Sequence, residues 1–376
     1  MKSDRARISK ALDGFLKPQR NRDDAGLSVG VESAPVTVSR RSAFNAKDRL
    51  TGMLMGCAIG DALGMPVEGL ENELTLRAIH RLGGIRDFLA PQAHVIKSLR
   101  RLRPGCWTDE TQLTLAITRS LIAEEGLDYD AIAEAHVYAF ETLELRGWEP
   151  TTKQACRRLA QGTDRRRSGK LGGSNNAVAA KIPPIAAYAT LKGEGREALL
   201  GHCVNVGIMT HHDPRAIVGA YLIALLTRDA LVGPRKWAPS PERYGELIEE
   251  ARWAEGLLAT TLGASDDPIS QHLEELSDAL DSDSVELAEF CNGATSYVCY
   301  SVPYCVALLC GRAWEFDDGI VAAVNGGGDT DTNGAMVGAI LGAAYGARKL
   351  PKRFLDKVEE AEIIREVGVG LSRLLS

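Results

Sequence analysis

The sequence predicts an all-α protein, and three observations support that fold class. Ala and Leu supply most of the apolar positions, apolar residues recur at helical spacing from about residue 48 onward, and the period-two alternation of β-strands is nearly absent. The composition, 45% hydrophobic and 25% charged, is that of a soluble globular protein with a sizeable core. A chain of 376 residues can hold one large domain or two ordinary ones, and length alone does not decide between them.

Composition and charge exclude several classes of protein. A formal net charge of -6 argues against nucleic acid as the main partner. The eight cysteines are scattered without a CxxC pair, as expected for reduced, mostly buried thiols of a cytoplasmic protein. The polar N-terminus lacks the apolar segment of a signal peptide, and the most apolar run, around Tyr297–Cys310, is too short to span a bilayer. We therefore expect a buried helix at this run, a cytoplasmic location and no membrane partner.

The first 46 residues differ from the rest of the chain. Through Lys47 the chain carries ten Lys or Arg against five Asp or Glu. Segment 23–41 has the composition of a flexible linker, and before it a short amphipathic helix is predicted from Ile8, Leu12, Phe15 and Leu16. Two interpretations stay open: a disordered tail, or a basic arm that orders on a partner or on its own body. The predicted domains are a flexible extension, 1–46, and an all-helical domain, 47–376.

The body is predicted to begin with a helix capped by Asp48. Glycines recur along this helix at every fourth residue, from Gly52 to Gly64, which lets its backbone approach a neighbour closely. A charged, glycine-rich loop, 71–105, follows. Further helices are predicted over 129–145, 151–160, 175–181, 217–226, 288–309, 317–324, 335–347 and 353–374, with a largely helical outer layer over 239–280 and a turn at 263–268.

The stretch Asn325–Gly334 is the strongest candidate for a functional site. Asp329 and Asp331 lie one residue apart, with Thr330 and Thr332 beside them. Such an oxygen-only ligand set suits a hard divalent cation such as Mg²⁺ or Mn²⁺. An ordinary helix cap would also favour Asp and Thr here, so the stretch alone does not choose between the two interpretations.

Two further acidic motifs favour the metal site. In Trp107–Thr111, Asp109 and Glu110 lie between two threonines at the start of an apolar helix, which is more than a cap requires. The segment 60–68 contributes Asp61 and Glu68 near the end of the glycine-rich helix. The chain therefore has three acidic motifs, each at a glycine-assisted helix edge.

Two loops are candidates for substrate contact. Leu171–Ala177 is a Gly/Ser/Asn turn at a helix start and can present backbone N–H groups to an anion. It follows the charge run Arg165–Arg167, which is either a solvated face or a phosphate contact. Met209–Ala216 contains paired histidines near an Asp. Because a hard cation prefers oxygen ligands, we interpret His211 as a substrate contact, with a solvated or core-satisfied pair as the alternative.

Taken in order, these motifs resemble those of the ADP-ribosylglycohydrolase family. The matching segments cover about residues 48 to 350 and are Gly60–Gly64 with Glu68, Thr108–Thr111, Thr210–Asp213 and Gly327–Thr332. The resemblance implies a compact orthogonal helical bundle with a binuclear cleft for two Mg²⁺ or Mn²⁺ ions. It implies that the metal ligands are Thr108, Asp109, Glu110, Asp329, Asp331 and Thr332. It further implies catalytic roles for Glu68, Asp109 and Asp331, and ADP-ribose contacts for His211, Ser174, Asn175, Gly327 and Gly328. Glu110 stands where the family usually has a second Asp and is one methylene longer.

The resemblance also implies an activity. Such enzymes remove ADP-ribose from modified proteins, and an arginine-directed branch cleaves an N-glycosidic bond. Cleavage at the ribose C1 builds oxocarbenium-like charge, and two metals can hold the ribose diol and a water while carboxylates accept the proton.

Three functions remain open. The first is a metal-dependent hydrolase acting on ADP-ribosylated proteins, arginine-linked by preference. As an immunity protein, it would also bind a cognate ADP-ribosyltransferase toxin through residues 1–46, which lie outside the resemblance. The second is a metabolic regulator of the dinitrogenase-reductase type. The third is a module with weak turnover that binds ADP-ribose or inhibits the transferase.

Overall fold

The computed structural model describes residues 40–69, 72–237 and 240–375, with side chains described from Ala46 onward. Within these residues helices make up almost all regular structure, and the two strands have two residues each. The all-α prediction is therefore confirmed. The predicted extension, 1–46, with its amphipathic segment and linker, lies almost wholly outside the described residues.

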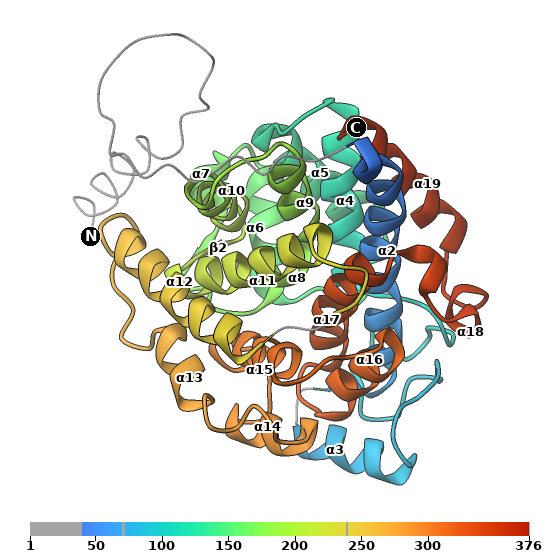
Figure 1. The fold of residues 1–376 in the computed structure, drawn as a ribbon. Helices are drawn as coiled ribbons and strands as arrows, with labels where there is room; N and C mark the ends of the chain where they lie inside the picture. Colours follow the sequence, from blue (N-terminus) through green and yellow to red (C-terminus); the bar gives the residue numbers. More distant parts are fainter. Residues whose placement is uncertain (1–39, 70–71, 238–239, 376) are drawn as a thin grey trace, which may run out of the picture.

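Two helices in close antiparallel contact form the centre of the fold: α2 (Arg40–Gly64) and α17 (Thr330–Tyr345). They lie side by side in Figure 1, α2 in blue and α17 in red. Their backbones meet at successive turns, where Gly52, Gly56, Gly60 and Gly64 face Gly342, Gly338, Gly334 and Thr330. A Cβ added to Gly60 would lie 1.9 Å from the carbonyl oxygen of Gly334. The predicted close packing is confirmed, and the partner is the helix that carries the acidic stretch.

The other helices pack around this pair (Figure 1). The pair contacts three helices toward the middle of the molecule: α4 (Asp109–Ala123), α8 (Ala177–Lys181) and α11 (Pro214–Val232). Two more helices pack on it: α19 (Ala361–Leu374) on α2, and α16 (Phe316–Asn325) on α17. The remaining elements are η1 (Met65–Val67), α3 (Asn72–Arg81), α5 (Tyr129–Thr142), α6 (Pro150–Ala160), α7 (Arg165–Ser168), β1 (Lys170–Leu171), α9 (Pro183–Leu191), α10 (Arg196–Gly207), β2 (His211–His212), α12 (Pro241–Ala259), α13 (Ile269–Glu275), α14 (Ser284–Phe290), α15 (Val298–Gly311), η2 (Ala347–Lys349) and α18 (Lys352–Leu355).

Several predicted helix boundaries are wrong. The segment 288–309 is two helices, α14 and α15, because Asn292 and Ala294 adopt positive φ angles of 49° and 48° between them. The segment 353–374 is likewise divided into α18 and α19 at Glu360, whose φ is 53°. The predicted loop 71–105 contains α3, and α17 begins at Thr330 instead of residue 335.

Asp48 is not a helix cap. Helix α2 already begins at Arg40, and Asp48 lies buried inside it. Its carboxylate pairs with Arg235 at 2.9 Å and accepts a hydrogen bond from the Arg348 backbone N–H at 3.1 Å. These long-range partners explain why an Asp occurs within a helix here.

The core of the described residues is one large apolar cluster with two small clusters beside it. All eight cysteines are free and buried, as predicted, and α15 is the buried helix expected around Tyr297–Cys310.

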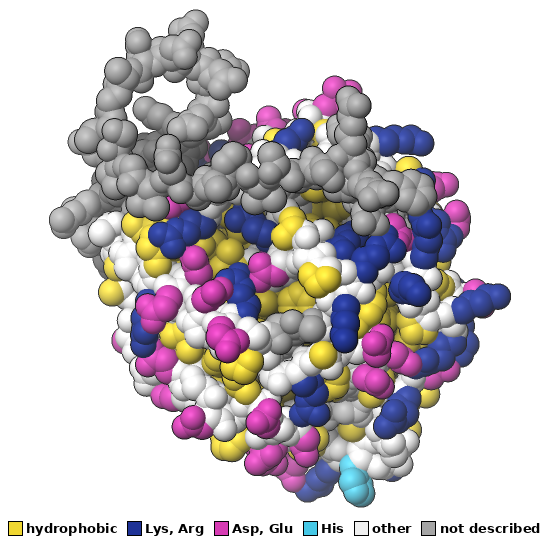
Figure 2. Space-filling view, viewed as in Figure 1, with side chains coloured by type: hydrophobic (Ala, Val, Ile, Leu, Met, Phe, Trp, Pro, Cys, Tyr) yellow, Lys and Arg dark blue, Asp and Glu magenta, His cyan; other side chains and the backbone are white. Residues whose placement is uncertain are grey.

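Among the described helices, the span Ala46–Val67 is long and apolar enough to cross a membrane, and it is entirely buried inside the protein as a core helix would be. On the face shown in Figure 2, basic and acidic side chains are intermingled.

Candidate functional site

The antiparallel pair brings two acidic motifs together, since the C-terminal end of α2 lies beside the N-terminal end of α17. The carboxylate oxygens of Glu68, Asp329 and Asp331 lie within 4.8 Å of one another. Asp331 is buried, and Glu68 and Asp329 are half-buried. The first turn of α4 adds the third motif, with Asp109 and Glu110 both buried.

Threonine hydroxyls connect the three motifs. Thr332 Oγ1 lies 2.7 Å from Glu110 Oε1 and 3.0 Å from Asp329 Oδ1. Thr108 Oγ1 lies 3.3 Å from Asp331 Oδ2. Glu110 therefore reaches the α17 side of the site despite its extra methylene. The structure gathers the six predicted ligand residues, from both α4 and α17, in one place.

Asp109 belongs to the same site. A Cβ on Gly147, whose φ is 80°, would lie 2.7 Å from Asp109 Oδ1, so the glycine leaves room for this carboxylate. Burial raises the pKa of Asp109 well above its usual value, and the neighbouring charges of Glu110, Asp61 and Glu68 add to that effect. Asp109 is thus close enough to interact with Glu110 in its own motif and with Asp61 and Glu68 in the motif at the end of α2.

The donor set fits hard divalent cations. Burial, followed by the charges of Asp329 and Asp61, raises the pKa of Glu68 to about 8. Burial and neighbouring carboxylates also hold the pKa values of Glu110 and Asp331 well above their ordinary range. Glu68 Oε2 and Glu110 Oε2 are buried and have no hydrogen-bond partner among the described residues. Cations would offset the repulsion and satisfy these oxygens, and an all-oxygen set suits Mg²⁺ or Mn²⁺.

Asp61 organises this site without offering a free ligand atom. It accepts hydrogen bonds from the backbone N–H of Thr108 at 2.9 Å and of Thr111 at 3.1 Å. It also accepts from their hydroxyls at 2.7 and 2.6 Å. Burial raises the pKa of Asp61 to about 6, even though these hydrogen bonds favour the carboxylate. Asp61 thereby fixes the start of α4 against α2.

The predicted substrate loop lies beside the acidic site. Ser174 and Asn175 are half-buried, and the loop is held by the bonds Val298 N–H to Ser174 O and Asn176 N–H to Ser296 O, both 3.0 Å. Asn176 Nδ2 donates to Asp329 Oδ2 and to Ser301 Oγ, each at 2.9 Å. Sequence reasoning missed Asn176, because nothing in the sequence distinguishes it from Asn175.

The glycines before Asp329 face protein atoms. Gly327 and Gly328 have φ angles of 87° and 71°. A Cβ on Gly328 would lie 2.2 Å from the carbonyl oxygen of Ala294, and one on Gly327 would lie 2.6 Å from Leu76 Cδ2. Close packing and backbone conformation therefore account for both glycines, and their contact with ADP-ribose stays a prediction.

His211 is fully buried. Its Nδ1 lies 2.9 Å from Thr210 Oγ1, and its Nε2 lies 3.4 Å from Glu149 Oε1. A Cβ on Gly173 would lie 3.4 Å from His211 Cδ2, which places the ring directly beneath the substrate loop. Direct contact between His211 and substrate stays a prediction.

Lys181 is a charged residue near the site that sequence reasoning missed. Its side chain is fully buried at the end of α8, and Nζ donates to Thr210 Oγ1 at 3.0 Å. Burial lowers its pKa to about 8, while the charges of Glu149, Glu110 and Asp109 favour the ammonium form. A lone Lys in the apolar run Ala177–Ile182 was the available signal.

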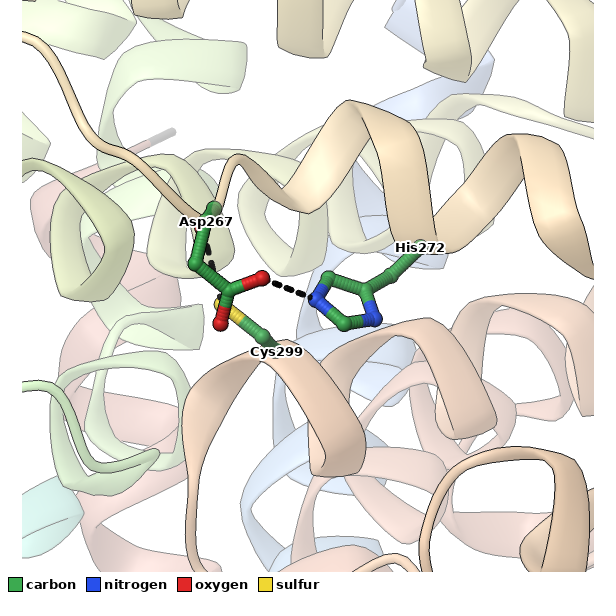
Figure 3. Close-up of side chains that lie close together, drawn as sticks. All are labelled: Asp267, His272 and Cys299. Atoms are coloured by element: carbon green, nitrogen blue, oxygen red, sulfur yellow. Dashed lines mark hydrogen bonds and ion pairs between the residues drawn. The ribbon is translucent and has the colours of Figure 1, made fainter.

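A second group of potential ligands lies on another part of the molecule. Asp267, His272 and Cys299 point toward one another from the turn before α13, from α13 and from α15 (Figure 3). His272 Nε2 lies 2.7 Å from Asp267 Oδ1, Cys299 Sγ lies 3.5 Å from Asp267 O, and Tyr297 donates to Asp267 Oδ2 at 2.5 Å. All three side chains already have hydrogen-bond partners, so the group is explained as a polar anchor between these elements.

An all-helical fold around a buried, oxygen-rich acidic centre defines the chain as a candidate binder of hard divalent cations. The family model described as ADP-ribosylglycohydrolase matches residues 43–375. The chain therefore belongs to the ADP-ribosylglycohydrolase family, a family of hydrolases.

Relatives and a solved structure agree with this assignment. The chain is 28% identical to ADP-ribosylhydrolase ARH3 of Bos taurus, over 88% of this chain and 94% of the relative. It is 28% identical to ADP-ribosyl-[dinitrogen reductase] glycohydrolase of Rhodospirillum rubrum, over 86% of this chain and 96% of the relative. It is 23% identical to ADP-ribosylarginine hydrolase Tri1 of Pseudomonas putida (strain GB-1), over 97% of this chain and 88% of the relative. A solved ADP-ribosylglycohydrolase-related protein complex shares the fold, with a TM-score of 0.65 at 23% identity, over 89% of this chain and all of that one.

Proposed function

We propose that this chain removes ADP-ribose from modified arginine side chains of proteins with two bound Mg²⁺ or Mn²⁺ ions. The observation that carries the proposal is the convergence of Glu68, Asp109, Glu110, Asp329 and Asp331 at one place beside the Ser174–Asn176 loop. The preference for arginine is supported by the likeness to a relative named an ADP-ribosylarginine hydrolase.

The acidic residues and threonines of the site have two proposed roles, to hold the cations and to accept a proton. Asp109, Glu110, Asp329 and Asp331, with Thr108 and Thr332, would hold the two cations, which supply Lewis-acid charge for the ribose diol and the attacking water. Asn176 and Thr332 hold Asp329 from two sides. Glu68, whose Oε2 is buried without a hydrogen-bond partner among the described residues, is the nearby carboxylate left free of the cations and would accept the proton of the water.

Glu110 retains what a cation ligand needs, although it is one methylene longer than the usual Asp. One carboxylate oxygen bonds to Thr332, and the other is buried without a hydrogen-bond partner in the described part of the chain. That free oxygen is what a ligand to a cation requires. The longer side chain is therefore compatible with metal binding, and the hydrolysis assay below separates the enzyme from the binding module.

We further propose that residues 1–46 bind a cognate ADP-ribosyltransferase, as an immunity protein would. The segment is basic. A match over 97% of the chain leaves fewer than 46 residues uncovered, so the likeness to Tri1 must extend into this segment. The likeness to the dinitrogen reductase glycohydrolase favours the alternative of a metabolic regulator, which needs no such arm.

Hydrolysis is tested with an ADP-ribosylarginine peptide and an O-linked ADP-ribosylserine peptide, each with Mg²⁺ or Mn²⁺. Release of free ADP-ribose from the arginine peptide is the expected result. Faster release from the serine peptide would contradict the arginine preference. No release from either peptide with either metal would support the binding module instead.

The arm is tested by deleting residues 1–39, which leaves α2 intact. The truncated protein should keep its hydrolysis rate and lose affinity for the cognate transferase. Equal transferase affinity in both proteins would remove the proposed role of the arm and leave the hydrolase proposal untouched.

A further inference from the structure

Lys181 begins a chain of hydrogen bonds that leads to the substrate loop. An ammonium group can only donate hydrogen bonds. Since Lys181 Nζ lies 3.0 Å from Thr210 Oγ1, the threonine oxygen accepts this bond and its own proton is free for another acceptor. The acceptors within reach are His211 Nδ1 at 2.9 Å and Gly207 O at 3.5 Å. The shorter contact indicates that Thr210 donates to His211.

The protonation of the ring follows from this direction. If Nδ1 of His211 accepts a hydrogen bond, the neutral imidazole must carry its proton on Nε2. Burial lowers the pKa of His211, and the charge of Lys181 acts in the same direction, although Glu149 opposes both. The ring is therefore neutral near pH 7, with an acceptor nitrogen on one side and a donor nitrogen on the other.

The contact on the Nε2 side of the His211 ring is consistent with a proton on Nε2. His211 Nε2 faces Glu149 Oε1 at 3.4 Å. Glu149 caps α6 and accepts from the backbone N–H groups of Thr151 and Thr152. Burial raises the pKa of Glu149, but the neighbouring His211 ring and the hydrogen bonds from Thr152 lower it to about 2, so the carboxylate is ionised. An N–H facing that carboxylate is favourable, whereas a lone pair facing it would be repelled.

The ring lies where it can support the substrate loop. β2, which contains His211, pairs with β1 immediately before the loop, with Lys170 opposite His211. Gly173 packs over the ring, and three residues later Asn176 holds Asp329. Hydrogen bonds and packing thus connect Lys181, through His211, to a carboxylate of the acidic site.

We propose that Lys181 is a positioning residue that, through Thr210, fixes His211 as the neutral imidazole protonated on Nε2, and so holds the ring against Glu149 beneath the 173–176 loop. The effect on turnover rests on the proposed hydrolase function, whereas the protonation of the ring does not.

The tautomer is measured by NMR of the full chain labelled with ¹⁵N-histidine, at pH 7, using the ¹⁵N shifts and ring-proton couplings of His211. The expected result is a neutral ring protonated on Nε2. Thr210→Ser, which keeps the hydroxyl, should show the same pattern, and Thr210→Val should show a mixture of tautomers. Lys181→Met should also give a mixture, whereas Lys192→Met removes an exposed lysine and serves as its control. A ring protonated on Nδ1 in the wild type, or an unchanged ring in both Thr210→Val and Lys181→Met, would overturn the proposal.

Kinetics test the connection to the loop. Lys181→Met should raise KM for the ADP-ribosylated peptide about five-fold, the effect of one lost hydrogen bond, with a smaller change in kcat. If Lys181→Met does not fold, the Thr210→Val and Thr210→Ser pair gives the same comparison. A shifted tautomer with unchanged KM would overturn the loop connection. Inactive wild-type protein would contradict the proposed function, and the NMR result would still decide the tautomer.

Discussion

Asp61 and Thr108 are joined twice, because the Asp61 carboxylate accepts both the backbone N–H and the hydroxyl of Thr108. The contact joins α2 to the first turn of α4, where Asp109 and Glu110 enter the site. A helix N-terminus also carries positive partial charge, which suits the buried carboxylate.

Asp61→Asn should therefore weaken cation binding without removing a proposed ligand. The amide has one acceptor oxygen where the carboxylate has two, so donors on Thr108 and Thr111 would be left unpaired at a cost of about 1–3 kcal/mol. We expect lower stability by urea denaturation together with a weaker Mn²⁺ affinity by calorimetry. Wild-type affinity in a destabilised variant would confine Asp61 to a role in folding.

Asp331→Asn removes one anionic ligand from the predicted site. It should lower the hydrolysis rate at least about 100-fold, the scale for loss of charge stabilisation at an active site. It should also reduce the number of Mn²⁺ ions bound per chain. An unchanged rate would mean that the catalytic site lies elsewhere.

The role of Glu110 as a metal ligand can be tested by changing the charge and the length of its side chain separately. Glu110→Gln removes the charge and should lose most activity, whereas Glu110→Asp restores the usual family residue and should stay within about ten-fold of wild type. The ratio of rates with Mg²⁺ and Mn²⁺ reports whether the methylene sets metal preference. Full activity of Glu110→Gln would exclude it as a ligand.

Gly60→Ala should strongly destabilise the protein. The added methyl group would lie 1.9 Å from the Gly334 carbonyl oxygen, so α2 and α17 must separate, at a cost of about 3 kcal/mol or more. Gly201→Ala is the matched control, since Gly201 lies within α10 and no atom is within 4 Å of its added Cβ. This control should gain about 0.5–1 kcal/mol. Thermal denaturation of both variants gives the comparison.

His136 should make the protein sensitive to acid. Burial, with the charge of Lys181, lowers its pKa from 6.5 to about 3. Because the unfolded chain binds the proton more tightly, the stability that this residue contributes is present above pH 6.5 and is lost as pH falls toward 3. The loss approaches roughly 4 kcal/mol.

Urea denaturation between pH 7 and 4 checks this prediction. His136→Gln, with no titrating group, should show a shallower loss of stability than wild type over that range. Parallel curves for the two proteins would show that His136 does not cause the acid sensitivity.

The parts of the site that sequence predicted are those encoded in short contiguous motifs. Asp329 and Asp331 are recognisable because glycines and threonines surround them, and α2 because its glycines recur at one spacing. The break at residues 291–297 has a turn signal, Asn292-Gly293, which the helix prediction overlooked. Its turn uses positive φ angles at Asn292, Gly293 and Ala294. Tertiary contacts hold that turn: Ala294 O accepts from the N–H of Asp329 and from Asn333 Nδ2.

The roles of residues that act through distant partners could not be predicted from the sequence. Glu149 reads as an ordinary helix cap until His211 is seen beside it. Lys181 reads as the polar end of a short helix, and only the fold shows that this end points into the interior. The role of each depends on a partner about 30 to 60 residues away in the chain.

The glycine contacts between α2 and α17 also fix the register of the two helices, and with it the distance between their acidic residues. Each helical residue advances about 1.5 Å and turns about 100°. The place of Asp61 along α2 is therefore set by its distance from Gly60, and that of Asp331 along α17 by its distance from Gly334. A single-residue deletion within either helix would displace one half of the acidic cluster from the other. Length changes in the surface loops would leave that spacing intact, so the loops can vary while the geometry of the acidic cluster stays the same.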